Sequence, residues 1–126
     1  MPQFTALTGA VLALLLTGLS LHISRLRIRH RVSFGDGGHK DLHVAIRAHG
    51  NALEQSLLLL VLMLLMELVR PGWSVVAAIG GVFVAARVLH AVAIFTRQLL
   101  LRQVAHVISV LCQLTLALGL LWWAIR

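Results

Sequence analysis

Charged side chains are scarce in this chain of 126 residues: they make up 12% of it, whereas hydrophobic residues make up 60%. The mean hydropathy is +0.94. A soluble globular domain carries about 25% charged residues, so this composition excludes that class of protein. The sequence therefore predicts an integral membrane protein whose apolar surface faces the lipid bilayer.

Cysteine is nearly absent as well, because Cys112 is the only one in the chain. A single thiol excludes an internal disulfide and any metal site that is built from several cysteines. Since Cys112 lies within an apolar run, we interpret it as a buried structural thiol. From the sequence we expect no metal site.

The apolar runs also lack the features of targeting segments and of nucleic-acid-binding proteins. The first run, residues 4–23, approaches the roughly 20 residues that cross a bilayer, and no small-residue cleavage site follows it, so we interpret it as a retained span. The net charge is +7, but the basic residues lie between apolar runs without aromatic residues among them. This arrangement predicts loop charges that set membrane orientation, and no partnership with nucleic acid.

Four apolar segments predict an all-α integral membrane protein, a bundle of four transmembrane helices in a single domain that covers residues 1–126. The second segment stops before Pro71-Gly72, because proline restricts the residue before it and glycine commonly ends helices. Basic residues concentrate in the first and third loops, which predicts that both loops are cytoplasmic and both termini lie outside. The predicted spans are residues 4–24, 47–69, 73–95 and 101–125.

Polar and ionisable residues form two columns within these spans, where they are costly and therefore indicate a functional site. Spacings of three and four residues put the members of each column on one helical face. A further pair, Arg87 and His90, lies near the end of the third span. The columns consist of His43, Arg47, Asn51 and Glu54, which lead into the second span, and of Arg102, His106, Ser109 and Gln113 in the fourth.

The predicted orientation brings these residues to the cytoplasmic ends of spans two to four. Cations outnumber the single carboxylate of Glu54, so we expect the ligand to be a polar anion that enters from the cytoplasm. Apolar walls beside the site would accept a lipophilic molecule from the bilayer, which suggests group transfer between the two. The Gly-rich segment 34–38 lacks the lysine of a phosphate-binding loop, and we interpret it as a flexible turn.

Three sequence blocks resemble the MAPEG family, the membrane-associated proteins of eicosanoid and glutathione metabolism. The resemblance covers nearly the whole chain and is strongest to the short bacterial members. The block in the second span is fairly specific, because a charged motif inside a membrane run is rare. The blocks are Phe34-Gly35-Asp36-Gly37, Arg47-Ala48-His49-Gly50-Asn51-Ala52-Leu53-Glu54 and Ala86-Arg87-Val88-Leu89-His90.

This resemblance implies a homotrimer in the bacterial inner membrane that binds glutathione between subunits near the cytoplasmic face. Arg102 matches the family arginine that lies beside the glutathione sulfur and favours thiolate over thiol, which makes it the expected catalytic residue. Asn51 and Glu54 match residues that hold the peptide backbone and the amino group. The expected glutathione-binding residues are Arg25, Asn51, Glu54, His90 and Arg102.

Arg47 and Arg87 also match family arginines, and we expect them to be structural residues that pair with carboxylates inside the bundle. Glu54 is a candidate partner, which competes with its expected role on glutathione. His49 points about 160° away from Asn51 around the helix, so we interpret it as a packing or interfacial residue.

The chain departs from the family pattern at several positions. It contains no tyrosine, although many family members place one near the sulfur. Ile94 stands one turn after His90, where the prostaglandin E synthase of the family has that tyrosine. Leu57 stands where a proline commonly follows the glutamate, and Gly50 replaces a further basic ligand of that synthase. Glutathione binding could therefore persist while catalysis is altered or absent.

Three functions stay open from the sequence. The first is a glutathione-dependent transferase or peroxidase that joins the glutathione thiolate to a lipophilic electrophile or hydroperoxide. The second is a non-catalytic membrane protein that keeps the scaffold and the glutathione site. The third is a haem protein with two axial histidines from among His22, His90 and His106, which lie near one membrane face on different predicted helices.

Overall fold

The computed structural model describes all residues from 1 to 126 and consists of four helices joined by short loops. Each helix is long and apolar enough to cross a membrane. The predicted all-helical architecture with four membrane-spanning helices is thus confirmed. The helices are α1 (Gln3–His30), α2 (Lys40–Val69), α3 (Ser74–Phe95) and α4 (Leu99–Ala124).

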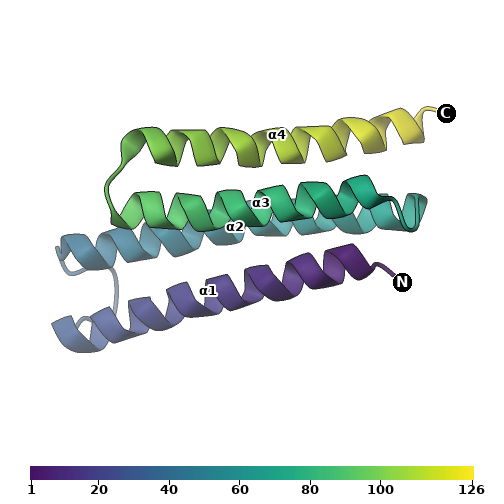
Figure 1. Ribbon diagram of the computed structural model, residues 1–126. Helices are drawn as coiled ribbons and strands as arrows, with labels where there is room; N and C mark the ends of the chain where they lie inside the picture. The colour runs from purple at the N-terminus through teal and green to yellow at the C-terminus, as the bar shows by residue number, and fades with distance from the viewer.

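Successive helices run in opposite directions along one bundle (Figure 1). Both termini and the α2–α3 turn lie at one end, which we call the terminal end. The α1–α2 and α3–α4 loops lie at the opposite end, which we call the loop end. The polar residues of the predicted site belong to the half of the bundle nearest the loop end, because α3 ends there and α4 begins there.

Two helices extend beyond the spans that hydropathy predicts. α1 continues to His30 and takes in the basic residues from Arg25 onward, whereas the predicted span stops at residue 24. α2 begins at Lys40, ahead of the predicted start at residue 47. A helix need not end where the hydrocarbon ends, and basic side chains in a last turn interact favourably with the helix dipole. The basic segment is therefore helical for most of its length rather than a loop.

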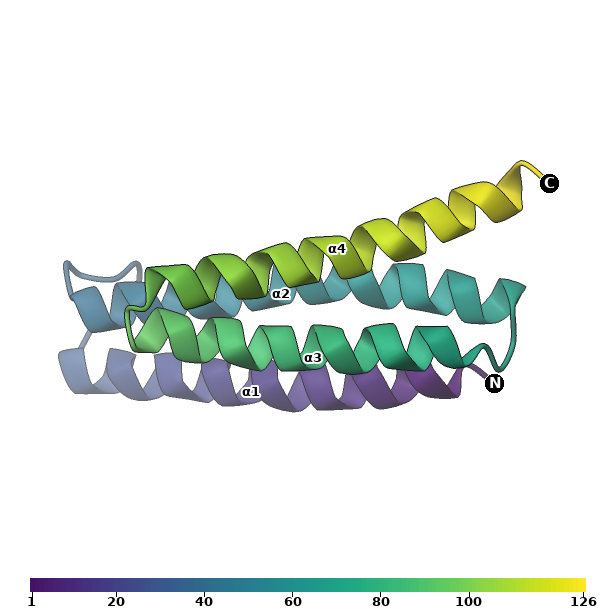
Figure 2. The same cartoon turned by 45° about the horizontal axis from the view of Figure 1, so that its top comes forward.

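α2 and α3 form the middle of the bundle, and α1 and α4 flank them. α1 and α4 each contact both central helices but not one another. In Figure 2, α4 diverges from the other helices towards its C-terminal end. The main apolar core lies where all four helices contribute side chains, and its buried members are Leu12, Leu59, Met63, Met66, Val76, Phe83, Cys112 and Leu116.

Gly80 on α3 lies close to side chains of both α1 and α2. A Cβ atom at this position would lie 2.5 Å from Thr8 Oγ1 on α1 and 2.8 Å from Met63 Cε on α2. Small residues let helices approach closely in lipid, where packing rather than hydrophobic burial drives helix association. A side chain at Gly80 would therefore require the side chains of Thr8 and Met63 to shift.

The helices that lead into the loop end both stop with the same backbone motif. Arg31 and Arg97 have φ angles of 54° and 57°, in the left-handed region. In each case the next amide donates to the carbonyl five residues back, Val32 to Arg27 at 3.0 Å and Gln98 to Ala93 at 2.9 Å. This is the Schellman pattern, in which glycine is the usual left-handed residue. Here an arginine occupies that position twice.

Glu67 on α2 forms hydrogen bonds with the start of α1 at the terminal end. Its Oε1 and Oε2 accept hydrogen bonds from the backbone amides of Phe4 at 3.1 Å and Thr5 at 2.6 Å. These amides belong to the first turn of α1, where the helix leaves its N–H groups unpaired and carries a partial positive charge. The carboxylate thus acts as a cap for a helix far away in sequence.

Candidate anion-binding site at the loop end

A buried arginine ties α2, α3 and α4 together. Arg87 is only 1% exposed. Its Nη1 donates to Asn51 Oδ1 at 2.9 Å, and its Nη2 donates to Ser109 Oγ at 2.5 Å and to the Ala105 carbonyl at 3.4 Å. Its Nε has no hydrogen-bond partner. The network therefore consists of one cation and neutral acceptors.

The structure does not contain the carboxylate pairing that we expected for Arg87 and Arg47. The ion pairs present are His30 with Asp41 and His43 with Asp36, and neither involves an arginine. The candidate partner Glu54 is exposed on the outer surface of α2, whereas Asn51, less than one turn earlier, faces α3. The amide takes the position beside Arg87, so the positive charge of Arg87 is solvated but not neutralised within the chain.

Next to this network is a cavity of about 280 Å³ between α2, the end of α3 and the start of α4. A larger cavity of about 590 Å³ lies nearer the loops. Both are lined by Arg47, Ile94 and Arg102, so they share a boundary. The other residues that line the smaller cavity are Asn51, His90, Gln103 and His106.

The larger cavity is strongly cationic. Asp36 is the only acidic residue that lines it, and its histidines are His39 and His43. Its basic residues are Lys40, Arg47, Arg97 and Arg102. Since guanidinium and ammonium groups pair with carboxylates and phosphates, the excess of cations suits an anionic ligand. This agrees with the polar anion expected from the sequence.

The structure brings together some of the predicted site residues and separates others. Asn51, His90 and Arg102 line one cavity, with Arg47 and His106 beside them. Arg25 and Glu54 are exposed and line neither of the two cavities. Arg25 lies on α1, which does not contact α4, the helix that carries Arg102.

The histidines considered as haem ligands are not gathered into one site. The His22 ring packs edge-on against Phe95, with 5.4 Å between ring centroids, and His22 lines neither of the two cavities. His90 and His106 line the same small cavity, on neighbouring helices.

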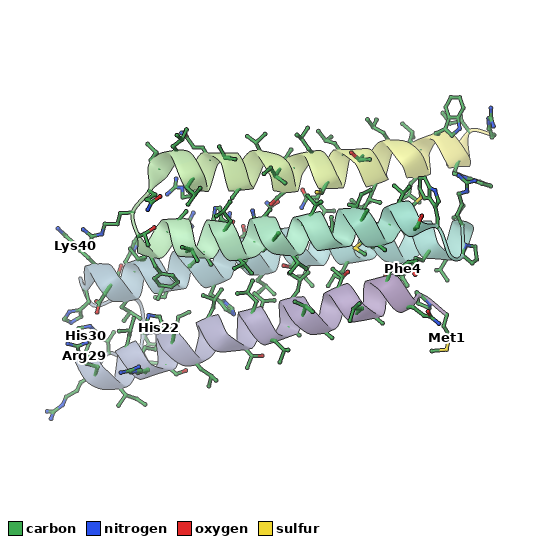
Figure 3. All side chains as sticks on the ribbon, viewed as in Figure 1. Met1, Phe4, His22, Arg29, His30 and Lys40 are labelled. Carbon is green, nitrogen blue, oxygen red and sulfur yellow. The ribbon has the colours of Figure 1, made fainter.

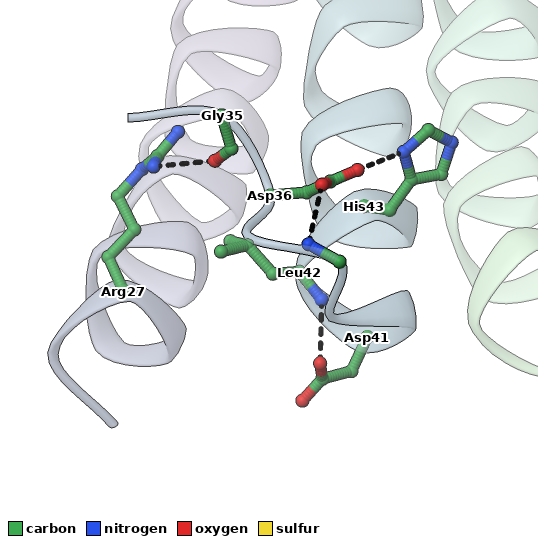
Figure 4. Close-up of polar contacts among 7 residues, drawn as sticks. Arg27, Gly35, Asp36, Asp41, Leu42 and His43 are labelled. Carbon is green, nitrogen blue, oxygen red and sulfur yellow. Dashed lines mark hydrogen bonds and ion pairs between the residues drawn. The ribbon is translucent and has the colours of Figure 1, made fainter. Parts of the chain in front are cut away.

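The α1–α2 loop supplies residues that the sequence analysis did not place in the site. We interpreted its Gly-rich segment as a flexible turn, but hydrogen bonds within the loop and to the flanking helices hold the turn in one conformation (Figure 4). Asp36 Oδ1 accepts from the Gly38 amide at 2.9 Å, and its Oδ2 lies 2.7 Å from His43 Nδ1. On the α1 side, Arg27 Nη1 donates to the Gly35 carbonyl at 2.8 Å.

The same contacts set the charge of Asp36. The hydrogen bond from the Gly38 amide, with help from His43, lowers the pKa of Asp36 below its ordinary value of 3.8. The carboxylate is therefore ionised at neutral pH. An aspartate followed two residues later by glycine is a turn signal in the sequence, because its side chain bonds a backbone amide two residues on. That signal could have predicted an ordered turn.

Comparison with known proteins decides the family. The model of the MAPEG family matches residues 5–122. The chain belongs to the MAPEG family. This confirms the family resemblance drawn from the sequence.

Two curated relatives are similar over a shorter stretch. The chain is 43% identical over 86 residues to the inner membrane protein YecN of Escherichia coli strain K12, a match that covers 68% of this chain and 66% of YecN. YecN of Escherichia coli O6:H1 gives the same identity and coverage. The matched stretch is thus just under two thirds of the length of these relatives.

Proposed function

We propose that this chain is a glutathione-dependent membrane enzyme of the transferase or peroxidase type in a bacterial inner membrane. The observation that carries the proposal is the position of Asn51, His90 and Arg102 around one cavity in a MAPEG chain. The name of the relative YecN supports the inner membrane as the location.

The charges at the loop end suit glutathione as the co-substrate. At neutral pH this tripeptide carries two carboxylates and one ammonium group. Arg47, Arg97 and Lys40 offer cationic partners for the carboxylates, and the ionised Asp36 offers one for the ammonium group. Val44 and Leu99 line the same cavity and give a lipophilic co-substrate an apolar surface.

In this proposal Arg102 is the catalytic residue. Its guanidinium stabilises the glutathione thiolate, the nucleophilic form. In transfer, the thiolate attacks an electrophilic carbon, a C–S bond forms, and the leaving group departs with its bonding electrons. With a hydroperoxide, the thiolate attacks the terminal oxygen and the O–O bond breaks. The alkoxide takes up a proton, and a second glutathione converts the sulfenic acid to a disulfide and water.

Self-association completes this site. Arg25 and Arg102 lie on helices that do not touch within one chain, and a second copy that contributes one of them would bring both to one ligand. Glu54 is exposed inside a membrane span, where an unpaired carboxylate facing lipid is costly. A homotrimer with ligand sites between subunits, as the family resemblance implies, would cover Glu54 and bring it to the ligand.

The distribution of basic residues supports a cytoplasmic loop end. Cytoplasmic loops of membrane proteins carry an excess of Lys and Arg. Of the eleven Lys and Arg residues in the chain, only Arg70 and Arg126 lie at the terminal end, and Arg87 lies buried between. The others belong to the loop end: Arg25, Arg27, Arg29, Arg31, Lys40, Arg47, Arg97 and Arg102.

Titration and turnover of the detergent-purified protein test the proposal. We expect saturable calorimetric binding of glutathione below millimolar concentration, together with turnover of a model aryl halide or a lipid hydroperoxide. Arg102→Leu should lower turnover by about 100-fold, because it removes one stabilising donor from the thiolate, while glutathione still binds. Arg126→Leu, at the terminal end, is the matched control. Absence of glutathione binding at millimolar concentration would refute the proposal.

A non-catalytic role is the second candidate, and one observation favours it. Ile94 stands where the related synthase has a tyrosine, and it lines both cavities. No hydroxyl replaces the tyrosine at this position. Glutathione binding without turnover of either substrate class would establish this alternative.

A further inference from the structure

Three potential metal ligands meet where α1 ends and α2 begins, outside the proposed catalytic residues. His30, His39 and Asp41 each offer one ligand atom, and these atoms lie within 4.8 Å of one another. His30 Nε2 is 2.8 Å from Asp41 Oδ2. The rings of His30 and His39 are stacked, with 3.9 Å between centroids and 17° between planes. Two imidazoles and a carboxylate therefore share one small region.

We propose that His30, His39 and Asp41 bind a divalent transition metal of the Zn²⁺ type. Two imidazoles and one carboxylate form a ligand set that Zn²⁺ uses when it keeps a fourth position for water. The same set also suits other first-row metals, so the proposal concerns this class of ion. It does not depend on the glutathione site.

Without a metal ion, the distances between the three ligand atoms are already close to those of a tetrahedral metal site. Zn–N and Zn–O bonds of about 2.0–2.2 Å place the ligand atoms of a tetrahedral site roughly 3.4 Å apart. The contact of His30 with Asp41 is already shorter than that. Lone pairs lie in the plane of an imidazole ring, so the stacked His39 ring must rotate to aim a nitrogen at the ion. Rotation about this terminal torsion has broad minima.

The surroundings contain a second pair of potential metal ligands and several basic residues that would oppose cation binding. His43 and Asp36 form a second imidazole–carboxylate pair, but only two ligand residues meet there. The nearest basic residues in the sequence are Arg29, Arg31 and Lys40, whose charges oppose a cation. Figure 3 shows the Lys40 side chain extending away from His30. The carboxylate of Asp41 offsets part of the remaining repulsion.

The position gives a bound ion a structural consequence. It would join the last turn of α1, through His30, to the start of α2, through His39 and Asp41. His39 also lines the larger cationic cavity, so the ion would hold one wall of that cavity. No metal site was predicted from the sequence, because a single cysteine excludes a cysteine cluster. His30, His39 and Asp41 become neighbours only when the α1–α2 loop folds back.

Calorimetric titration of metal-stripped, detergent-purified full-length protein with ZnCl₂ tests the proposal. We expect one ion per chain and a rise in melting temperature. His30→Ala and His39→Ala should each weaken Zn²⁺ affinity by at least about tenfold. His22→Ala and His49→Ala are matched controls, and His43→Ala tests the competing pair; all three should keep the affinity of the unmodified protein.

Melting curves in EDTA show whether each variant is folded. If His30→Ala is less stable without metal, His30→Gln keeps a hydrogen-bonding side chain and serves in its place. Absence of saturable Zn²⁺ binding would overturn the proposal, and so would equal affinity in the His30 and His39 variants and the controls. Loss of affinity in His43→Ala alone would move the site to the Asp36 pair and overturn it as well.

Discussion

Two buried charges, Glu67 and Arg87, lie towards opposite ends of this bundle and are solvated in different ways. Glu67 is 5% exposed and accepts two backbone amides from the first turn of α1. Arg87 is 1% exposed and donates to one amide oxygen, one hydroxyl and one carbonyl. The helix N-terminus that Glu67 caps carries a partial positive charge, whereas the acceptors of Arg87 carry no formal charge.

The difference shows how a buried charge becomes either structural or functional. The charge of Glu67 is compensated locally, and the residue lines neither of the two large cavities. Arg87 keeps its net charge, and its acceptor Asn51 lines the cavity that also holds Arg102. Electrostatic interactions are strong where the effective dielectric constant is low. Arg87 therefore adds positive potential to a site that it does not line.

The largest effect is expected from removing the arginine of this pair. Arg87→Leu leaves Asn51 Oδ1 and Ser109 Oγ without their buried donor, which costs about 1–3 kcal/mol for each unsatisfied group. We therefore expect the free energy of unfolding to fall by about 2–6 kcal/mol, measured by thermal or detergent-induced unfolding. Glutathione affinity should fall too. Arg126→Leu is the control, and an unchanged stability in Arg87→Leu would contradict the role of the network.

A smaller effect is expected at the other charge. Glu67→Gln keeps the shape of the side chain but loses the charge that faces the start of α1, so we expect a loss of about 1–2 kcal/mol in the free energy of unfolding. Glutathione affinity should stay unchanged, because Glu67 caps a helix at the far end. If Glu67→Gln changed glutathione affinity as much as Arg87→Leu does, the assignment of a purely structural role to Glu67 would be wrong.

The smallest effect concerns pH at the α1–α2 loop. Because the pKa of Asp36 is lowered from 3.8 by the Gly38 amide and His43, ionised Asp36 stabilises the folded loop. This contribution is fully present above about pH 4 and is lost as the pH falls through the lowered pKa. In hydrogen exchange, we expect Asp36→Asn to reduce protection of the Gly38 amide at neutral pH, with little effect on α3. Equal protection in both proteins would show that the turn does not need the charge.

The sequence was informative about whole helices and less so about their ends. Hydropathy located four spans, because a membrane helix is apolar along about 20 residues. It placed the end of the first span before the Arg25–Arg31 segment, yet α1 continues to His30. Backbone hydrogen bonding continues in water as well as in lipid, so hydropathy reports the bilayer boundary rather than the end of the helix.

The candidate site was partly predictable for a similar reason. Helical spacing within a span identified Asn51, His90 and Arg102, which line one cavity. Spacing could not show that Asn51 would face Arg87 while Glu54 would be exposed, because that depends on how α2 is rotated against α3. Loop residues such as Arg97 were missed because their neighbours come from other parts of the chain.

The two Schellman caps bear on how the chain enters the membrane. A non-glycine residue in the left-handed region costs about 1–2 kcal/mol, so glycine at positions 31 and 97 would give a more stable turn. Arginine at both positions puts a permanent charge at the tip of each helical hairpin, α1–α2 and α3–α4. A charged tip resists translocation across the bilayer. Arg31 and Arg97 thus lower the stability of the folded turns, but their charges would keep the hairpin tips on one side of the membrane during insertion.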